Sequence, residues 1–408
     1  MARERLHILV VGGSIAGLFA ALALRRQGHA VSVFERSATT LDGRGAGIVT
    51  HPALFALMRE VGLAFVPDDL GVSVPGRRVL SPSGEIAGER ALPQILTSWG
   101  RIYRLLRSGV PEADLHHGRA LLRVDDRAGG VVAAFADGTQ AEGDLLVGAD
   151  GLFSAVRGQI LPQAQPLYAG YVAWRGLVEE ADLSAPTRDR LCDRFAFCLP
   201  PGEQMLSYPV AGADEAVTPG RRRLNFVWYR PAAAEDALPR LLTDRDGIRH
   251  DLSIPPHRIR PEVLDAMRAD AHRLLAPPYA EAVARSPQPF LQAILDLETP
   301  AMAMGRVALI GDAAFVARPH VGMGVTKAMA DGAALARALA AEPDVPAALA
   351  AFDAVRRPAG AAVIARARAL GAYMQAQALS PAEREAAERH RRPEAVMAET
   401  AVATPDLL

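Results

Sequence analysis

The chain has 408 residues, of which 50% are hydrophobic and 22% are charged, and its formal net charge is −1. This balance, together with the absence of any apolar run of the roughly 18 residues that a membrane span needs, argues against nucleic acid and membranes as partners and favours the cytoplasm. The only two cysteines, Cys192 and Cys198, exclude a disulfide scaffold or a cysteine zinc cluster, and we expect no metal site.

The first predicted element is a buried strand at residues 6–13 (LHILVVGG), an apolar run that ends in glycines. Apolar residues then recur at helical spacing from Ile15 to Arg26, and Gly28 is the expected C-cap of that helix. A second strand follows at 31–35 (VSVFE). Strand, helix and strand form a βαβ unit, which predicts a right-handed crossover and a parallel sheet.

The middle of the chain has a different pattern. Residues 71–90 carry the Pro, Gly and Ser residues of a hairpin, a helix is expected near Arg101–Arg107, and a strand-turn-strand is centred on Asp137-Gly138. From about 166 to 230, short aromatic-rich segments separated by Pro and Gly are typical of an antiparallel sheet. A helix at about 261–276 follows.

The strand-plus-glycine pattern returns at 305–314 (GRVALIGDAA), before alanine-rich helices from 324 to 370 and a charged tail expected to be partly helical and then frayed. This order predicts an α/β fold in which a Rossmann-like domain receives an inserted antiparallel sheet domain and ends in helices. The nucleotide-binding domain is expected at 1–70, 98–165 and 300–370, the sheet domain at 71–97 and 166–299, and the helical tail at 371–408.

The first candidate site is the turn at residues 12–17 (GGSIAG), between strand and helix. A glycine-rich turn lets a pyrophosphate sit on backbone N–H groups at the positive end of a helix. The residues expected to hold it are Gly12, Ser14, Ile15 and Ala16; serine replaces the usual glycine, fits if its φ is negative, and offers a hydroxyl. Glu35, 23 residues after Gly12, suits a ribose diol, and Arg36 is expected either at the surface or along the adenine.

Two later strand ends carry further polar residues. Asp150 and Gly151 follow a strand, with Arg157 at the start of the next helix, and Asp312 follows another strand at a position that suits the ribityl hydroxyls of a flavin. The turn after it enters a helix whose N–H groups can face a reduced flavin, and it contributes Pro319, Gly322, Gly324 and Val325. The alternative for each aspartate alone is a helix cap or turn residue.

These motifs together resemble a known family. GGSIAGL with FER, GADGLFSAVR, and GDAA with RPHVGMGV are similar to the motifs of the p-hydroxybenzoate hydroxylase class of group A flavoprotein monooxygenases. YAGYVAWRG, RLNFVWY and DRDGIRHDLSIPP look more like the 2,6-dihydroxypyridine 3-monooxygenase subfamily. The resemblance covers about residues 6 to 365. It departs from the wider class at Ser14, at Trp99 with Tyr103 in place of an arginine, and at Lys327 in place of an asparagine.

The resemblance implies an enzyme that binds FAD, takes a hydride from transiently bound NADH or NADPH, and hydroxylates a small aromatic ring with O₂ through a flavin C4a-hydroperoxide. It adds Gly47, Ile48 and Tyr103 to the expected FAD-binding residues, and relatives suggest a homodimer. The first substrate to test is 2,6-dihydroxypyridine; the alternatives are another hydroxylated N-heterocycle or a phenol such as salicylate.

The ring must be electron-rich, so a base or hydrogen-bond acceptor near its hydroxyl is expected. The catalytic candidates are His320, next to the flavin-facing turn, and Tyr208 and Asn225 on the aromatic sheet; packing and capping are the alternatives for each. Trp174 and Arg175 point to opposite faces of a strand, and for Arg175 an interdomain or structural ion pair is expected rather than a substrate contact.

Two other functions remain open from the sequence: a flavin-dependent reductase on the same fold, and a dinucleotide-binding regulator without redox chemistry. A halogenase is disfavoured because no WxWxIP-like segment occurs.

Overall fold

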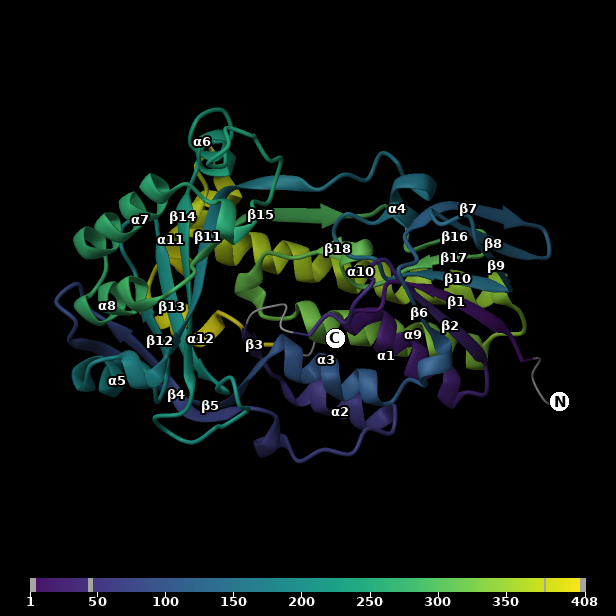
Figure 1. Ribbon diagram of the computed structural model, residues 1–408, viewed down its shortest axis with the longest axis horizontal. Helices are drawn as coiled ribbons and strands as arrows, with labels where there is room; N and C mark the ends of the chain where they lie inside the picture. The colour runs from purple at the N-terminus through teal and green to yellow at the C-terminus, as the bar shows by residue number, and fades with distance from the viewer. Residues whose placement is uncertain (1–4, 43–46, 378, 404–408) are drawn as a thin grey trace.

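The computed structural model describes residues 5–42, 47–377 and 379–403 of the chain. A six-stranded sheet and a nine-stranded sheet lie at the two ends of the molecule, and the long helix α10 (Val345–Gly371) extends between them (Figure 1). The mixed α/β class predicted from the sequence is therefore confirmed, with a mostly parallel six-stranded sheet and a second, larger sheet.

The six-stranded sheet contains the predicted βαβ unit. β1 (His7–Val11) pairs in parallel with β2 (Ala30–Glu35) on one side and with β10 (Leu145–Gly148) on the other. α1 (Ile15–Arg26) connects β1 to β2, and α9 (Gly324–Ala341) packs against α1. The sheet is completed by β6 (Leu115–His117) at one edge and by β17 (Val307–Leu309) and β16 (Ala303–Met304) at the other.

The nine-stranded sheet contains the aromatic segments. Its strands lie in the order β18 (Phe315–Val316), β15 (Phe290–Glu298), β11 (Leu167–Glu179), β14 (Arg223–Pro231), β13 (Gln204–Val210), β12 (Phe195–Cys198), β4 (Val72–Leu80), β5 (Ile86–Ser98) and β3 (Gly47–Val49). Neighbours are antiparallel, as predicted, except that β12 and β4 are parallel. The exception arises because β4 comes from a remote hairpin, so no short turn fixes its direction relative to β12.

The two faces of this sheet have different coverings. On one face Trp174 and Trp228 are buried with residues of α7 (Pro261–Leu274) and α8 (Pro277–Arg285). α5 (Ala185–Leu191) packs on α8, and α6 (Ala237–Leu242) contributes Leu238 and Leu242 to the same buried cluster. The opposite face carries Tyr171, Tyr208 and Tyr229 and points inward. Strand alternation therefore separates a structural face from a second face, which we call the aromatic sheet face.

The remaining strands form a small sheet of β7 (Leu121–Arg127), β8 (Gly130–Phe135) and β9 (Gln140–Gly143). The predicted turn at Asp137-Gly138 joins β8 to β9, but the segment after it holds two strands rather than one, since β10 belongs to the parallel sheet. The break falls at Asp144, whose side chain accepts a hydrogen bond from the His7 N–H at 2.7 Å. Three further helices are α2 (Pro52–Glu60), α3 (Trp99–Ser108) and α4 (Ala155–Ile160).

The C-terminal tail is ordered over more of its length than predicted. It forms α11 (Pro381–His390) and α12 (Pro393–Glu399), and α12 packs on β4 and β5. The buried Arg77 fixes this packing, because its guanidinium donates to the carbonyl oxygens of Met397 and Ala401 at 3.1 and 3.3 Å. The expected fraying therefore does not occur in the part of the tail that the structure describes.

Cys192 and Cys198 are both buried and free. Within the described ranges, no helix combines the length and the hydropathy that crossing a membrane would require.

Candidate functional site

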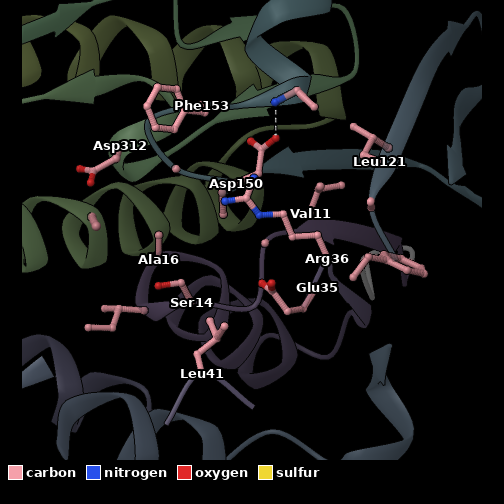
Figure 2. Close-up of a pocket in the computed structure, with 18 of the residues that line it drawn as sticks. Val11, Ser14, Ala16, Glu35, Arg36, Leu41, Leu121, Asp150, Phe153 and Asp312 are labelled. Atoms are coloured by element: carbon pink, nitrogen blue, oxygen red, sulfur yellow. Dashed lines mark hydrogen bonds between the residues drawn. The ribbon is translucent and has the colours of Figure 1, made fainter. Parts of the chain in front are cut away.

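A pocket of about 490 Å³ lies at the carboxyl ends of β1, β2, β10 and β17, where ligands of open parallel sheets bind. Ser14, Glu35, Asp150 and Asp312 all line it, although they come from four separate segments of the chain. Figure 2 shows Ser14 and Glu35 on one side of the pocket, with Asp150 and Asp312 across from them. The fold thus brings together the three sets of strand-end residues singled out in the sequence.

The glycine turn approaches the neighbouring strand too closely for a side chain. Gly12 has a φ of +111°, and a Cβ there would lie 2.3 Å from the Ala149 carbonyl oxygen. Ser14 has a φ of −91°, the negative value that a serine needs here, and its hydroxyl makes no helix-cap hydrogen bond. Ile15 and Ala16 also line the pocket. The first turn of α1 therefore offers backbone N–H groups and one uncommitted hydroxyl to an anion.

Glu35 is fixed by the backbone around it. Its Oε2 accepts from the Gly13 N–H and its Oε1 from the Ser37 N–H, each at 2.8 Å. Each carboxylate oxygen has a further lone pair, so these bonds orient the group and still leave it able to accept from a ribose diol. The exposed Arg36 lines the pocket beside it.

Asp150 both caps a helix and lines the pocket. Its Oδ2 accepts from the N–H groups of Ala155 and Val156 at 2.7 and 3.2 Å, and its Oδ1 accepts from the Ser154 hydroxyl. Burial raises the pKa of Asp150, and these hydrogen bonds oppose the increase. The contacts of Asp150 are therefore those of a helix cap, the alternative that the sequence offered for this residue. Gly151 beside it faces open pocket space, since a Cβ there would meet nothing within 4 Å.

Arg157, predicted to contact the cofactor, does not line the pocket. Its guanidinium donates to the carbonyl oxygens of Leu152, Ala164 and Ala313 at 2.6, 3.1 and 3.0 Å. It joins the loop after β10 to the turn after β17, and we infer an indirect role in shaping the pocket.

Asp312 is open to the pocket but lies deep in the molecule, and burial raises its pKa while Lys327 lowers it. The turn that carries it is held from behind. Lys327 donates to the Gly311 carbonyl oxygen at 2.9 Å and to Asp331 at 3.1 Å, and Arg356 donates to Asp331 at 2.9 Å. Lys327 is buried in this cluster and does not line the pocket. The lysine that replaces the asparagine of the wider class therefore holds the Asp312 turn in place.

The turn before α9 divides into two parts. Gly324 and Val325 line the pocket, and a Cβ on Gly324 would meet nothing within 4 Å. Pro319 and Gly322 lie away from the lining, and a Cβ on Gly322 would lie 2.5 Å from the Ala401 side chain. The start of α9 is therefore a second helix N-terminus directed at the same pocket.

The last predicted cofactor residues lie outside the lining. Gly47, which β3 joins to Ile48, donates to the Asn225 amide oxygen at 3.4 Å, and a Cβ on it would lie 2.4 Å from the Tyr208 ring. Tyr103 stacks on Trp99 with ring centroids 4.9 Å apart. Trp99, rather than Tyr103, reaches the pocket.

The three catalytic candidates lie on or against the aromatic sheet face. Tyr208 and Asn225 are directly opposite each other on β13 and β14. His320 packs on Tyr229 with centroids 4.1 Å apart, and its Nε2 lies 2.9 Å from the Tyr171 hydroxyl. Burial, aided by nearby arginine charges, lowers the pKa of His320 to about 3. The imidazole is therefore neutral at physiological pH and suited to hydrogen bonding rather than to proton uptake.

Several pocket residues were not predicted, namely Phe34, Leu41, Trp99, Arg119, Leu121 and Phe153. Phe153 has a detectable sequence signal, because it is a large apolar residue two positions after the Asp150-Gly151 motif. In the structure its side chain is 54% exposed. Arg119 lies between β6 and β7 and Leu121 is the first residue of β7, and neither position carries a motif.

Comparisons with known proteins agree with this geometry. A family described as FAD binding domain matches residues 291–367, an FAD binding domain-like family matches 168–296, and an NAD(P)-binding Rossmann-like domain matches 10–48. The 2,6-dihydroxypyridine 3-monooxygenase of Paenarthrobacter nicotinovorans is 33% identical over 90% of this chain and 91% of its own length.

Solved structures give the same result. The 2,6-dihydroxypyridine-3-hydroxylase from Arthrobacter nicotinovorans superimposes with a TM-score of 0.85 at 32% identity, covering 93% of this chain and 95% of its own. Klebsiella pneumoniae HpxO, complexed with FAD and uric acid, gives a TM-score of 0.74 at 26% identity, with coverage of 97% and 93%.

Proposed function

Because the chain belongs to the group A flavoprotein monooxygenases, which use FAD, NAD(P)H and O₂ to hydroxylate small aromatic or heteroaromatic rings, we propose that its substrate is 2,6-dihydroxypyridine or a closely related hydroxylated N-heteroaromatic ring. The choice of ring rests on the similarity to 2,6-dihydroxypyridine 3-monooxygenase. The observation that carries the flavin chemistry is the convergence of Ser14, Glu35, Asp150 and Asp312 on one pocket. The pocket suits a dinucleotide, because four strands end at it and four helices, α1, α3, α4 and α9, begin with a residue that lines it.

The residues present fit FAD. Gly151 and Gly324 face open pocket space that a larger side chain would fill, and the start of α1 supplies donors for a pyrophosphate. In our proposal Glu35 binds the adenosine ribose and Asp312 binds the ribityl chain. When bound, FAD supplies the redox chemistry that accepts a hydride, reacts with O₂ and delivers one oxygen atom to the ring.

The chain's own contribution is positioning and electrostatics. The N-terminus of α9 places N–H groups at Gly324 and Val325, which would stabilise negative charge on a flavin bound in the pocket. His320 is neutral, and its two ring nitrogens bond to the Tyr171 hydroxyl and to Gln204 Oε1. In our proposal it therefore positions Tyr171 on the aromatic sheet face, while Tyr208 and Asn225 orient the ring.

The test is oxygen uptake and NADH or NADPH oxidation by the FAD-loaded protein, with 2,6-dihydroxypyridine, salicylate or no ring added. We expect at least about tenfold stimulation by the heteroaromatic ring and a product heavier by one oxygen atom, since binding energy is used at the chemical step. Nicotinamide oxidation without a hydroxylated product would instead favour a reductase. Protein that takes up no FAD would favour the regulator.

The homodimer, the cytoplasmic location and the division into a discontinuous nucleotide domain and a sheet domain stay predictions. The first is tested by light scattering of the FAD-loaded protein.

A further inference from the structure

Arg175 is a buried cation on the aromatic sheet face. Strand alternation in β11 places Trp174 among the helices on the outer face and turns Arg175 inward, toward the side that holds Tyr208 and Tyr229. The Arg175 side chain is only 9% exposed. Its position is central, because its cross-strand neighbour is Val227 in the middle of β14.

Among the residues that the structure describes, this guanidinium has no hydrogen-bond or ion-pair partner. Seven arginines are buried among the described residues, and six of them donate to a carboxylate or a carbonyl oxygen: Arg77, Arg78, Arg157, Arg222, Arg318 and Arg356. The Nε of Arg175 has no hydrogen-bond partner, and its other nitrogens make no hydrogen bond or ion pair within the described ranges. The structural ion pair expected from the sequence is therefore absent from the part of the chain that the structure describes.

A second donor without a partner lies on the same face. The Asn225 side chain is 1% exposed, its oxygen accepts from the Gly47 N–H, and its Nδ2 has no partner. Asn225 pairs across the strands with Leu177, two residues along β11 from Arg175. Diagonal neighbours of this kind lie roughly 7–8 Å apart, within reach of one small ring.

The surroundings favour an anion over a cation. Arg175 exerts a positive electrostatic influence on the phenols of Tyr208 and Tyr229 and on the neutral imidazole of His320, and none of these groups is an anion. The buried carboxylate of Asp296 is already bound by Arg318. Aromatic walls with one cation and one amide donor are complementary to a planar ring that carries an anionic oxygen.

We propose that Arg175 and the Nδ2 of Asn225 bind an anionic oxygen on the ring substrate, either an ionised hydroxyl or a ring carboxylate. The inference rests on the proposed function and narrows its substrate class to rings that are anionic when bound. An arginine beside a ring hydroxyl favours its ionised form, and ionisation makes the ring more electron-rich toward oxygen transfer. Arg175 is thus a specificity-determining residue, and its missing ion-pair partner is the substrate.

The experiment measures ring binding without nicotinamide, from the change in flavin absorbance of the FAD-loaded protein. The ligands are 2,6-dihydroxypyridine, which ionises at a hydroxyl, salicylate, which carries a carboxylate, and 2,6-dimethoxypyridine, which does neither. The variants are Arg175→Met and Arg175→Lys. Arg230→Gln is the matched control, because Arg230 lies on β14 but contacts Glu203 and Asp270 on the outer face.

We expect wild-type protein to bind one of the two ionisable rings at least about tenfold more tightly than the dimethoxy ring, as charge-assisted hydrogen bonds predict. The ring that binds identifies the source of the anionic oxygen. Arg175→Met should lower the affinity for that ring by about ten- to a hundredfold, and Arg175→Lys should restore part of the loss. Arg230→Gln should bind the ring as tightly as the wild type does.

Equal binding of the dimethoxy ring by wild-type protein overturns the inference without any variant, so a misfolded Arg175→Met would not rescue it. Unchanged ring affinity in an Arg175→Met protein that retains FAD also overturns it, while leaving the proposed function in place. If FAD is held but neither ionisable ring binds, the proposed substrate class fails together with the inference.

Discussion

The nucleotide pocket and the aromatic sheet face treat buried polar groups in opposite ways. In the pocket, Glu35 and Asp150 are bonded to backbone N–H groups within the protein. On the sheet face, Arg175 and Asn225 keep donors that have no partner in the described residues. The pocket is therefore organised before any ligand arrives, whereas the sheet face holds an uncompensated charge whose electrostatic cost a ligand can offset.

The largest effect on the nucleotide pocket is expected from a substitution at Gly12. In Gly12→Ala the new Cβ would lie 2.3 Å from the Ala149 carbonyl oxygen, at a φ of +111° that alanine rarely adopts. We expect FAD affinity to fall by at least about a hundredfold, or about 2.7 kcal/mol, because the turn must move away from the pyrophosphate. Fluorescence titration of apoprotein with FAD measures the change.

Gly158→Ala is the control for that substitution, since a Cβ on Gly158 would meet nothing within 4 Å. It should bind FAD as wild type does. Normal affinity in Gly12→Ala would show that the pocket is not organised by this close approach.

Two buried arginines differ in whether they have an ion-pair partner among the described residues, so their removal should change stability differently. Arg318 donates to Asp296 from Nη2 at 2.8 Å, and both side chains are 5% exposed. Arg318→Met leaves Asp296 without its main partner, so the free energy of unfolding should fall by about 3 kcal/mol. Arg175→Met removes a buried charge that lacks a partner, so without a ring ligand its stability should stay level or rise by about 1 kcal/mol.

Urea unfolding of the two variants, at equal FAD concentration and without ring ligands, measures the contrast. A loss of stability in Arg175→Met as large as that in Arg318→Met would mean that Arg175 has a structural partner after all.

The third prediction concerns pH and follows from His320. Its pKa is lowered from 6.5 to about 3, first by burial and then by the charges of Arg318 and Arg175. Below pH 6.5 the unfolded chain takes up a proton that the folded protein refuses, so stability is full above 6.5 and declines toward pH 3. The slope from this residue is at most about 1.4 kcal/mol per pH unit.

His320→Gln keeps a hydrogen-bonding side chain but does not titrate. Between about pH 7 and about pH 5 the wild-type protein should lose about 2 kcal/mol more unfolding free energy than this variant. His257→Gln, at an exposed position, should follow the wild type. Parallel slopes for wild type and His320→Gln would place the imidazole in contact with water.

The pocket was the more predictable of the two regions, and the reason is physical. Its chemistry depends on backbone geometry, which leaves local marks: glycines where chains approach closely, and acids directly after apolar strands. Gly12, Ser14, Glu35, Asp150 and Asp312 could be placed together from such marks alone. The domain boundaries and the cofactor roles of these residues stay predictions.

Residues that support the pocket left weaker marks. Arg157 was assigned to the pocket from its place at a helix start and Tyr103 from resemblance. Both bond behind it, because a long side chain can reach either way from one backbone position. Trp99 reaches the pocket although the sequence drew attention to it only through its neighbour Tyr103. A motif predicts where the backbone of a residue lies, but it does not predict the direction in which a long side chain points.

To predict which residues line the aromatic sheet face, the register of its strands must be known. A sequence pattern fixes that register only when the turns between strands are short. Alternation indicated that Trp174 and Arg175 face opposite ways, but not which face is lined by helices. Whether Arg175 has a partner depends on the side chains of all the strands around it, and a local sequence pattern does not contain that information.

The smallest expected effect belongs to Ser14, and it separates ligand binding from folding. The Ser14 hydroxyl makes no cap hydrogen bond with α1, whereas the Ser184 hydroxyl accepts from the Thr187 N–H at the start of α5. Ser14→Ala should therefore leave apoprotein stability unchanged and weaken FAD by about three- to tenfold, the contribution of one hydrogen bond. Ser184→Ala should show the reverse, losing about 1 kcal/mol of stability with normal FAD affinity. If Ser14→Ala lost stability and kept its FAD affinity, the hydroxyl would belong to the helix and not to the pocket.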